Sequence, residues 1–164
     1  GEVKEESDRN VAIGTNALGQ TNNNSFTDNV AIGHRSLSGG SSSFAKTKCV
    51  AVGASAGIRN NTNCVAIGAN AALYMEGGGN VAIGMDAMNN YDVDGQNNIC
   101  IGHSAKLHSK SVPATIENSI AIGYNVEVSD SNQIIIGSSS HAVVEIAGKR
   151  IIFNEEVLLG NKYN

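Results

Sequence analysis

The sequence repeats a five-residue motif eight times along its 164 residues. The copies are NVAIG at 10–14, 29–33 and 80–84, CVAVG at 49–53, CVAIG at 64–68, NICIG at 98–102, SIAIG at 119–123 and QIIIG at 133–137. Successive motif glycines are 19, 20, 15, 16, 18, 21 and 14 residues apart, so the shorter unit carries insertions in four places. Repeats of this length are typical of a solenoid, in which each unit buries its apolar face by stacking on its neighbours.

Each motif has the residue pattern of a β-strand. Two aliphatic residues flank one residue that is usually alanine, as in Val11, Ala12 and Ile13, and this alternation has the period of two expected of a strand. A helix would place Val, Gly and Asn at the centre of every unit, against their propensities. The sequence therefore predicts an all-β fold, a parallel β-roll or β-solenoid of about eight short coils stacked about 4.8 Å apart.

The segment after each glycine carries a second pattern. TNAL, HRSL and MDAM follow the first, second and fifth motifs, and the third residue of such segments is small. We expect a short strand to return along the coil here, with Leu18, Leu37 and Met88 filling gaps in the core. Only 4% of the residues are aromatic, so the core must be thin and closely layered.

The middle residue of each motif also predicts an assembly. A strand position that faces water normally carries Thr, Lys, Ser or Glu, whereas this column is almost entirely alanine. One coil is too short to cover both faces of its own sheet, so we expect a symmetric homo-oligomer whose axis is lined by the column. The alternative is an exposed alanine stripe without a role. The predicted axis residues are Ala12, Ala31, Ala51, Ala66, Ala82, Cys100, Ala121 and Ile135.

The charge and hydropathy of the chain exclude two classes of partner. The formal net charge is −4 and no cluster of Lys and Arg occurs, so we expect no nucleic-acid binding. No apolar run approaches the roughly 20 residues that cross a bilayer, so we expect no membrane insertion.

The run NVAIGTNAL and its relatives, over about residues 8–140, resemble the YadA-like head repeats of trimeric autotransporter adhesins and the repeats of bacteriophage and large-virus fibres. The resemblance implies a left-handed parallel β-roll in an intertwined or side-by-side homotrimer. It also implies that the Val and Ile columns fill each roll, with the alanine column toward the three-fold axis.

The resemblance implies a trimeric, non-catalytic fibre or head module on a virion surface or cell surface, which attaches to a host receptor that is a glycan or a protein. The long polar insertions and the thiols of Cys49, Cys64 and Cys100 favour a viral fibre, because thiols persist in a reducing cytosol. The alternatives are the head of a bacterial adhesin, a polysaccharide-degrading spike and a purely structural spacer.

No enzyme motif, cofactor site or metal site is predicted. Asp92, Asp94 and Gly95 form only half of a calcium loop, because the other ligands are missing. His34 and His103 each follow a motif glycine, where they either meet their symmetry copies or remain exposed at a corner. Cys49 and Cys64 occupy equivalent places in adjacent coils, and we expect a reduced pair because strand spacing exceeds the Cβ separation of a disulfide.

The insertions are the predicted site of recognition. Four aromatic residues lie in or beside them, and aromatic side chains in polar loops suit contact with a receptor or a glycan. The same side chains could instead clamp the loops onto the roll, and both interpretations stay open. The candidate binding residues are Phe26, Phe44, Tyr74 and Tyr91.

Three regions are predicted along the chain. Residues 1–9 form a lead-in, and residues 10–137 form the repeat domain. Residues 138–164 break the repeat, and two β-rich runs joined by AGKR predict a hairpin. We expect this segment to be a β cap or neck, because the open end of a solenoid needs cover.

Overall fold

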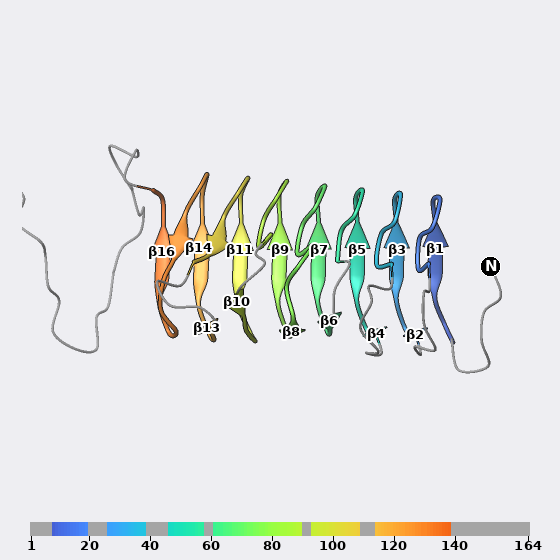
Figure 1. Cartoon of the computed structure of the whole chain (residues 1–164), viewed down its shortest axis with the longest axis horizontal. Coiled ribbons are helices and arrows are strands. Elements are labelled where there is room, and N and C mark those ends of the chain that lie inside the picture. The colour runs from blue at the N-terminus through green and yellow to red at the C-terminus, as the bar shows by residue number, and fades with distance from the viewer. Residues whose placement is uncertain are drawn as a thin grey trace, which may run out of the picture.

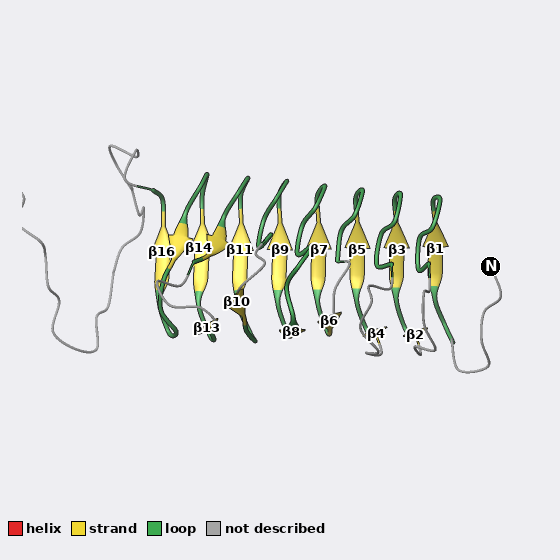
Figure 2. Ribbon diagram, in the orientation of Figure 1, coloured by secondary structure: helices red, strands yellow, loops and turns green. Residues whose placement is uncertain are grey.

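A computed structural model describes residues 8–19, 26–38, 46–57, 61–89, 93–108 and 114–138. In these ranges the chain winds into a parallel β-solenoid whose coils follow one another along a single axis (Figure 1). Strands alternate with loops, and the described ranges contain no helix (Figure 2), and so none that could cross a membrane. The prediction of an all-β fold of stacked coils is confirmed.

The eight motifs form one parallel sheet in which every strand has three residues. Neighbouring strands pair in register, so that Val11 lies beside Val30 and Ala12 beside Ala31, and the same register continues to the last strand. In sheet order the strands are β1 (Val11–Ile13), β3 (Val30–Ile32), β5 (Val50–Val52), β7 (Val65–Ile67), β9 (Val81–Ile83), β11 (Ile99–Ile101), β14 (Ile120–Ile122) and β16 (Ile134–Ile136).

Two-residue strands form the other walls of the roll. One four-stranded sheet contains β2 (Phe26–Thr27), β4 (Lys46–Thr47), β6 (Asn61–Thr62) and β8 (Gly77–Gly78). Two further pairs join β10 (Val93–Asp94) to β13 (Ala114–Thr115), and β12 (Lys106–Leu107) to β15 (Glu127–Val128). All of these pairs are parallel.

The predicted strand directly after each glycine is wrong for the first five coils. There the chain makes a turn, in which the Ala17 amide donates to the Gly14 carbonyl at 3.2 Å. Asn16 and Leu18 have φ of +58° and +50°, which a strand cannot contain. Coils still bond to each other through these turns, since the Leu18 amide donates to the Ser36 carbonyl at 2.9 Å. As predicted, Leu37 and Met88 are buried in the core.

The alanine column lies inside the roll of a single chain. Ala31, Ala51, Ala82, Ala121 and Cys100 are 0% exposed, and Ala66 is 2% exposed. Across from them stand the small residues that come third after each glycine, all buried: Ser36, Ala56, Ala71, Ala87 and Ala105. Only the end positions differ, because Ala12 is exposed and Ile135 is half-buried. The assignment of this column to a surface covered by other chains was wrong.

The thickness of the roll explains this reversal. A Cβ atom added to Gly57 would lie 3.4 Å from the Ala51 Cβ and 3.7 Å from the Ala66 Cβ. The Ser36 hydroxyl reaches across the interior to donate to the Ala51 carbonyl at 2.9 Å. In the coils where alanine faces a small residue, the two layers therefore leave room for methyl groups and not for Val or Ile side chains, which turn outward.

The predicted C-terminal hairpin and most of the lead-in lie outside the described residues, which include only Ser138 of the segment 138–164. Asp8 and Arg9 belong to the lead-in and are described, and Asp8 forms a parallel bridge with Thr27.

Candidate functional site

An apolar ribbon runs along the outer face of the eight-stranded sheet. It consists of the first and third residues of each long strand, and these side chains are half-buried or exposed in the single chain. Exposure reaches 58% at Ile13 and 65% at Ile134. The ribbon residues are Val11, Ile13, Val30, Ile32, Val50, Val52, Val65, Ile67, Val81, Ile83, Ile99, Ile101, Ile120, Ile122, Ile134 and Ile136.

The size and continuity of the ribbon make it a candidate interaction surface. Eight strands about 4.8 Å apart give it a length of roughly 34 Å. Every one of its side chains is Val or Ile, so no charged group interrupts it. Contiguous apolar surfaces of this kind are uncommon on soluble monomers and usually mark sites of association.

A second exposed column borders the ribbon. It contains the residues that directly follow the motif glycines, among them Met85, His103 and Tyr124. Met85 and Tyr124 are exposed, and the rings of His103 and Tyr124 lie 5.5 Å apart with a tilt of 58°. Met85 and Tyr124 add exposed apolar surface after the fifth and seventh motifs.

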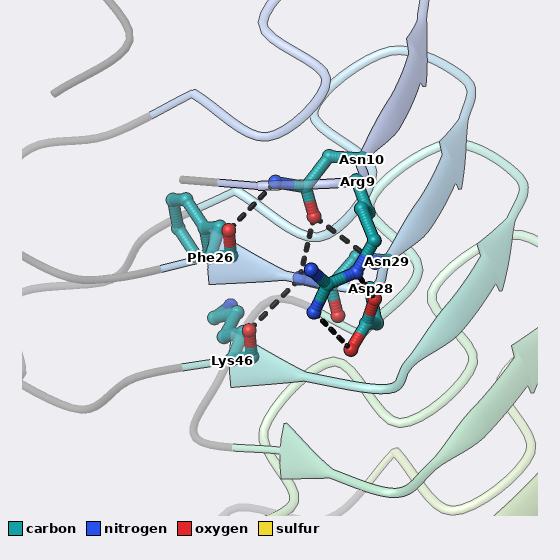
Figure 3. Close-up of polar contacts among 6 residues, drawn as sticks. All are labelled: Arg9, Asn10, Phe26, Asp28, Asn29 and Lys46. Atoms are coloured by element: carbon teal, nitrogen blue, oxygen red, sulfur yellow. Dashed lines mark hydrogen bonds and ion pairs between the residues drawn. The ribbon is translucent and has the colours of Figure 1, made fainter. Parts of the chain in front are cut away.

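A ladder of side chains, buried except at its two half-buried ends, runs along the edge where the long strands begin. Asn29 and Asn98 show its pattern: each side chain bonds to the backbone of the next coil, on both sides of the corner. Asn29 Nδ2 donates to the Lys46 carbonyl at 2.8 Å, and Asn29 Oδ1 accepts from the Cys49 amide at 3.0 Å. Figure 3 shows the first rungs at Asn10 and Asn29. The ladder residues are Asn10, Asn29, Cys49, Cys64, Asn80, Asn98, Ser119 and Gln133.

The ladder joins each coil to the next at the corner between two sheets. Asn98 Oδ1 accepts from the Ser119 amide at 2.9 Å, and Asn98 Nδ2 donates to the Ile116 carbonyl at 2.7 Å. Asn98 is completely buried. The Asn98 side chain thus supplies hydrogen-bond partners to two backbone groups, the Ser119 amide and the Ile116 carbonyl.

We expect Asn98→Ala to lower the free energy of unfolding by about 3 kcal/mol, because two buried backbone groups lose their partners. Asn98→Cys should cost less, because cysteine occupies this column in two other coils. Urea unfolding followed by circular dichroism measures both. Gln96→Ala, at an exposed position in the same coil, is the control and should change stability by less than about 0.5 kcal/mol. Equal losses of unfolding free energy for Asn98→Ala and Gln96→Ala would show that the Asn98 side chain does not stabilise the roll.

An outer corner column lies directly before the ladder. Its residues adopt left-handed backbone conformations, with φ of +53° at Arg9, +59° at Asp28 and +55° at Lys48. Arg9 and Asp28 form a two-point ion pair between adjacent coils (Figure 3). The hydrogen bond from Arg9 lowers the pKa of Asp28. Because both groups face solvent, the pair contributes little to stability.

A lysine occupies the interior of the roll. Lys46 is 1% exposed and stands in register with the buried Phe26 (Figure 3). Its Nζ donates to the Ser38 carbonyl at 2.7 Å and to the Gly57 carbonyl at 3.3 Å. Loss of hydration on burial lowers the pKa of Lys46 to about 7. Sequence reasoning missed this residue, since nothing in its local pattern separates it from the exposed Lys48.

Cys49 and Cys64 are adjacent, buried members of the ladder, and Lys46 lies near enough to Cys49 for their charges to interact. All three cysteines are thiols in the structure. The hydrogen bond from Cys64 lowers the pKa of Cys49 to about 7, and the same bond together with burial raises the pKa of Cys64. Burial alone raises the pKa of Cys100, in the alanine column, to about 12.

The predicted aromatic site residues do not form one surface. Phe26 is 2% exposed and begins β2, so it packs inside the roll and cannot contact a receptor there. The prediction was wrong for this residue because Phe26 belongs to the wall and not to the polar insertion before it. Tyr74 is half-buried, and Phe44 and Tyr91 lie outside the described residues.

The histidines and acidic residues stay dispersed. His34, His103 and Asp94 are exposed, and Asp92 lies outside the described residues. Within the described ranges, no group of three or more His, Cys, Asp or Glu side chains gathers where it could hold a metal ion.

The ladder could have been found from the sequence. The residue before each strand is always Asn, Cys, Ser or Gln, which are small or amide side chains able to bond at a buried corner. No protein-family model matches this chain, and comparison with curated proteins found no match either.

Proposed function

We propose that this chain is a trimeric fibre or head module of a virus, which attaches to a host surface and carries out no catalysis. The observation that carries the proposal is the apolar ribbon along the whole roll. Burying such a surface requires an equally long apolar surface, and a second and third copy of the chain supply one in register.

Two features support a trimer. The ribbon is narrow and has two parallel columns, one of Val or Ile at the first strand position and one mostly of Ile at the third. In a three-fold arrangement each column contacts a different neighbour, so three ribbons enclose a common apolar axis. This axis is lined by Val and Ile and replaces the alanine axis expected from the sequence.

The rigidity of the roll supports a role in a fibre. Adjacent coils are joined by in-register strand pairing, by backbone hydrogen bonds between their turns and by the hydrogen bonds of the ladder. Contacts between adjacent coils extend from Asp8 to Gly137. A rod of this kind holds the points at which the insertions join its coils at fixed distances along its length. The buried thiols suit a protein that assembles in a reducing cytosol, which favours a viral fibre over a secreted bacterial head.

Binding to intact cells tests the attachment role. Fluorescently labelled protein should bind saturably to a subset of a panel of bacterial and eukaryotic cells, or to defined glycans on an array. An assembly-deficient variant should bind at least tenfold more weakly, because three linked sites add avidity. Blank results on both panels would favour the structural spacer, and release of oligosaccharides from the array would favour the polysaccharide-degrading spike. Either result contradicts attachment without catalysis.

A further inference from the structure

Two of the eight ladder positions are cysteines, and they belong to consecutive coils. Cys49 precedes β5 and Cys64 precedes β7, and these two strands are neighbours in the long sheet. Every other ladder position holds Asn, Ser or Gln. The two thiols therefore lie at an interface where no amide side chain of the ladder bridges the two coils.

The backbone holds the two cysteines within reach of each other. The Val50 amide donates to the Cys64 carbonyl at 2.9 Å, and Val50 pairs in register with Val65. Parallel strands place equivalent Cα atoms about 4.8 Å apart, inside the range of about 4.4–6.8 Å that disulfides span.

The two side chains occupy equivalent places on strands that pair in register, near enough that Cys64 favours the thiolate of Cys49. Each thiol bonds to backbone carbonyls: Cys64 Sγ lies 3.1 Å from the Thr62 oxygen, and Cys49 Sγ lies 3.4 Å from the Thr47 oxygen. Disulfide Cβ atoms lie about 3.5–4.5 Å apart, so closure needs only a small approach of the two Cβ atoms.

The position of Cys49, three residues after the buried Lys46, favours Cys49 over Cys64 as the nucleophile. The Lys46 ammonium adds a favourable charge interaction with a Cys49 thiolate. Lys46 is itself held inside the roll by the Ser38 and Gly57 carbonyls. Thiolates, and not thiols, react with oxidants.

We propose that Cys49 and Cys64 are an oxidisable pair, which closes into a disulfide between consecutive coils when the protein meets a peroxide. The Cys49 thiolate attacks one peroxide oxygen, the O–O bond breaks, and a sulfenic acid and one hydroxide form. Cys64 sulfur then attacks the Cys49 sulfur, the S–O bond breaks, and the second hydroxide leaves. The two thiol protons convert both hydroxides to water, so two thiols and one peroxide give one disulfide and two waters.

The disulfide would replace the missing rung of the ladder with a covalent link. It joins the third long strand, β5, to the fourth, β7, and restricts their separation on unfolding. Because both sulfurs are buried, reaction requires transient opening of the corner, so the disulfide should form slowly in the folded protein and reverse slowly on reduction. The proposal is independent of trimer formation, since both cysteines belong to one chain.

Hydrogen peroxide treatment of the folded natural chain tests the site. Intact mass should fall by about 2 Da, the mass of the two hydrogens lost. Peptide mapping without reduction should find the Cys49–Cys64 link alone, although three pairings of three cysteines exist and unfolded chain should give a mixture. A mixture from folded protein, addition of oxygen atoms without a link, or links between chains would each overturn the proposal.

The unfolding temperature is a second test, because a disulfide that merely forms in unfolded chains would not stabilise the native fold. In a Cys100→Ala background, which restores the residue usual for that column, oxidation should raise the unfolding temperature by roughly 5–10 °C, and a thiol reductant should reverse the rise. The matched variants Cys49→Asn and Cys64→Asn restore the usual ladder residue and should show no shift. An equal shift in these variants would contradict a stabilising Cys49–Cys64 disulfide. So would an unchanged unfolding temperature of the Cys100→Ala protein after the disulfide has formed.

Discussion

Replacing Gly68 with alanine is expected to lower the free energy of unfolding by about 4 kcal/mol or more, enough to leave much of the chain unfolded at 37 °C. Gly68 has φ of +130°, a conformation that residues with a Cβ atom rarely adopt. An added Cβ would also lie 2.4 Å from the Gly84 carbonyl oxygen of the next coil. The coil spacing is fixed by hydrogen bonds on both sides, so the clash cannot be relieved locally. Circular dichroism during thermal and urea unfolding measures the loss.

Gly57→Ala is the matched control for this prediction. Gly57 also has positive φ, at +63°, but Leu18, Leu37, Ala72 and Met88 adopt φ between +49° and +52° at the same place in other coils. The added Cβ would meet the end of the flexible Leu37 side chain at 3.0 Å. We expect a cost of about 1–2 kcal/mol. Similar losses at Gly57 and Gly68 would show that close coil stacking at the glycine column does not decide stability.

Placing charges on the apolar ribbon is expected to abolish assembly. Light scattering of the natural chain should give about three times 16.9 kDa, or about 51 kDa. The variant Ile83→Lys with Ile101→Glu should give the mass of one chain, because a trimer would bury both charges beside an apolar axis. Ile83 and Ile101 pair in register on adjacent strands, so the opposite charges can neutralise each other in the isolated chain and preserve its fold.

A control with the same charge change away from the ribbon separates assembly from general effects of charge. His108→Glu with Thr115→Lys alters two exposed residues outside the long sheet, and this variant should remain a trimer. Circular dichroism should show the same strand signal in all three proteins. A natural chain that is a stable monomer, or a ribbon variant that still forms trimers, contradicts the assignment of the ribbon to the assembly axis.

Much of the fold was predictable from the alternation of residues in the motif. Eight three-residue strands occur where eight motifs were recognised, and each pairs in register with its neighbour. Register follows from the repeat itself, because a shift of one residue would set Val against Ala and expose different faces in adjacent coils. The return segment was predicted less well, since alternating positive φ at residues such as Asn16 and Leu18 is not visible in a pattern of hydrophobicity.

The candidate site was predicted only in part. The stacking of Cys49 on Cys64 followed from the repeat, and their burial agrees with it. Lys46 and Phe26 show the limit, because each stands beside a polar insertion in the sequence yet lies inside the wall of the roll. A residue's position relative to the wall depends on where the coil closes, and the insertions hide that point.

The sequence by itself determined which residues share a face: Val and Ile on one side of each strand, alanine or its substitutes on the other. Only the tertiary structure decided which of these faces is inside. The chain returns so close to its own sheet that Ala51 and Ala56 fill the space between the two walls, and at these positions the separation admits methyl groups and excludes Val and Ile. Periodicity records alternation along a strand, whereas the inward direction depends on the distance to the opposite wall, which the rest of the coil sets.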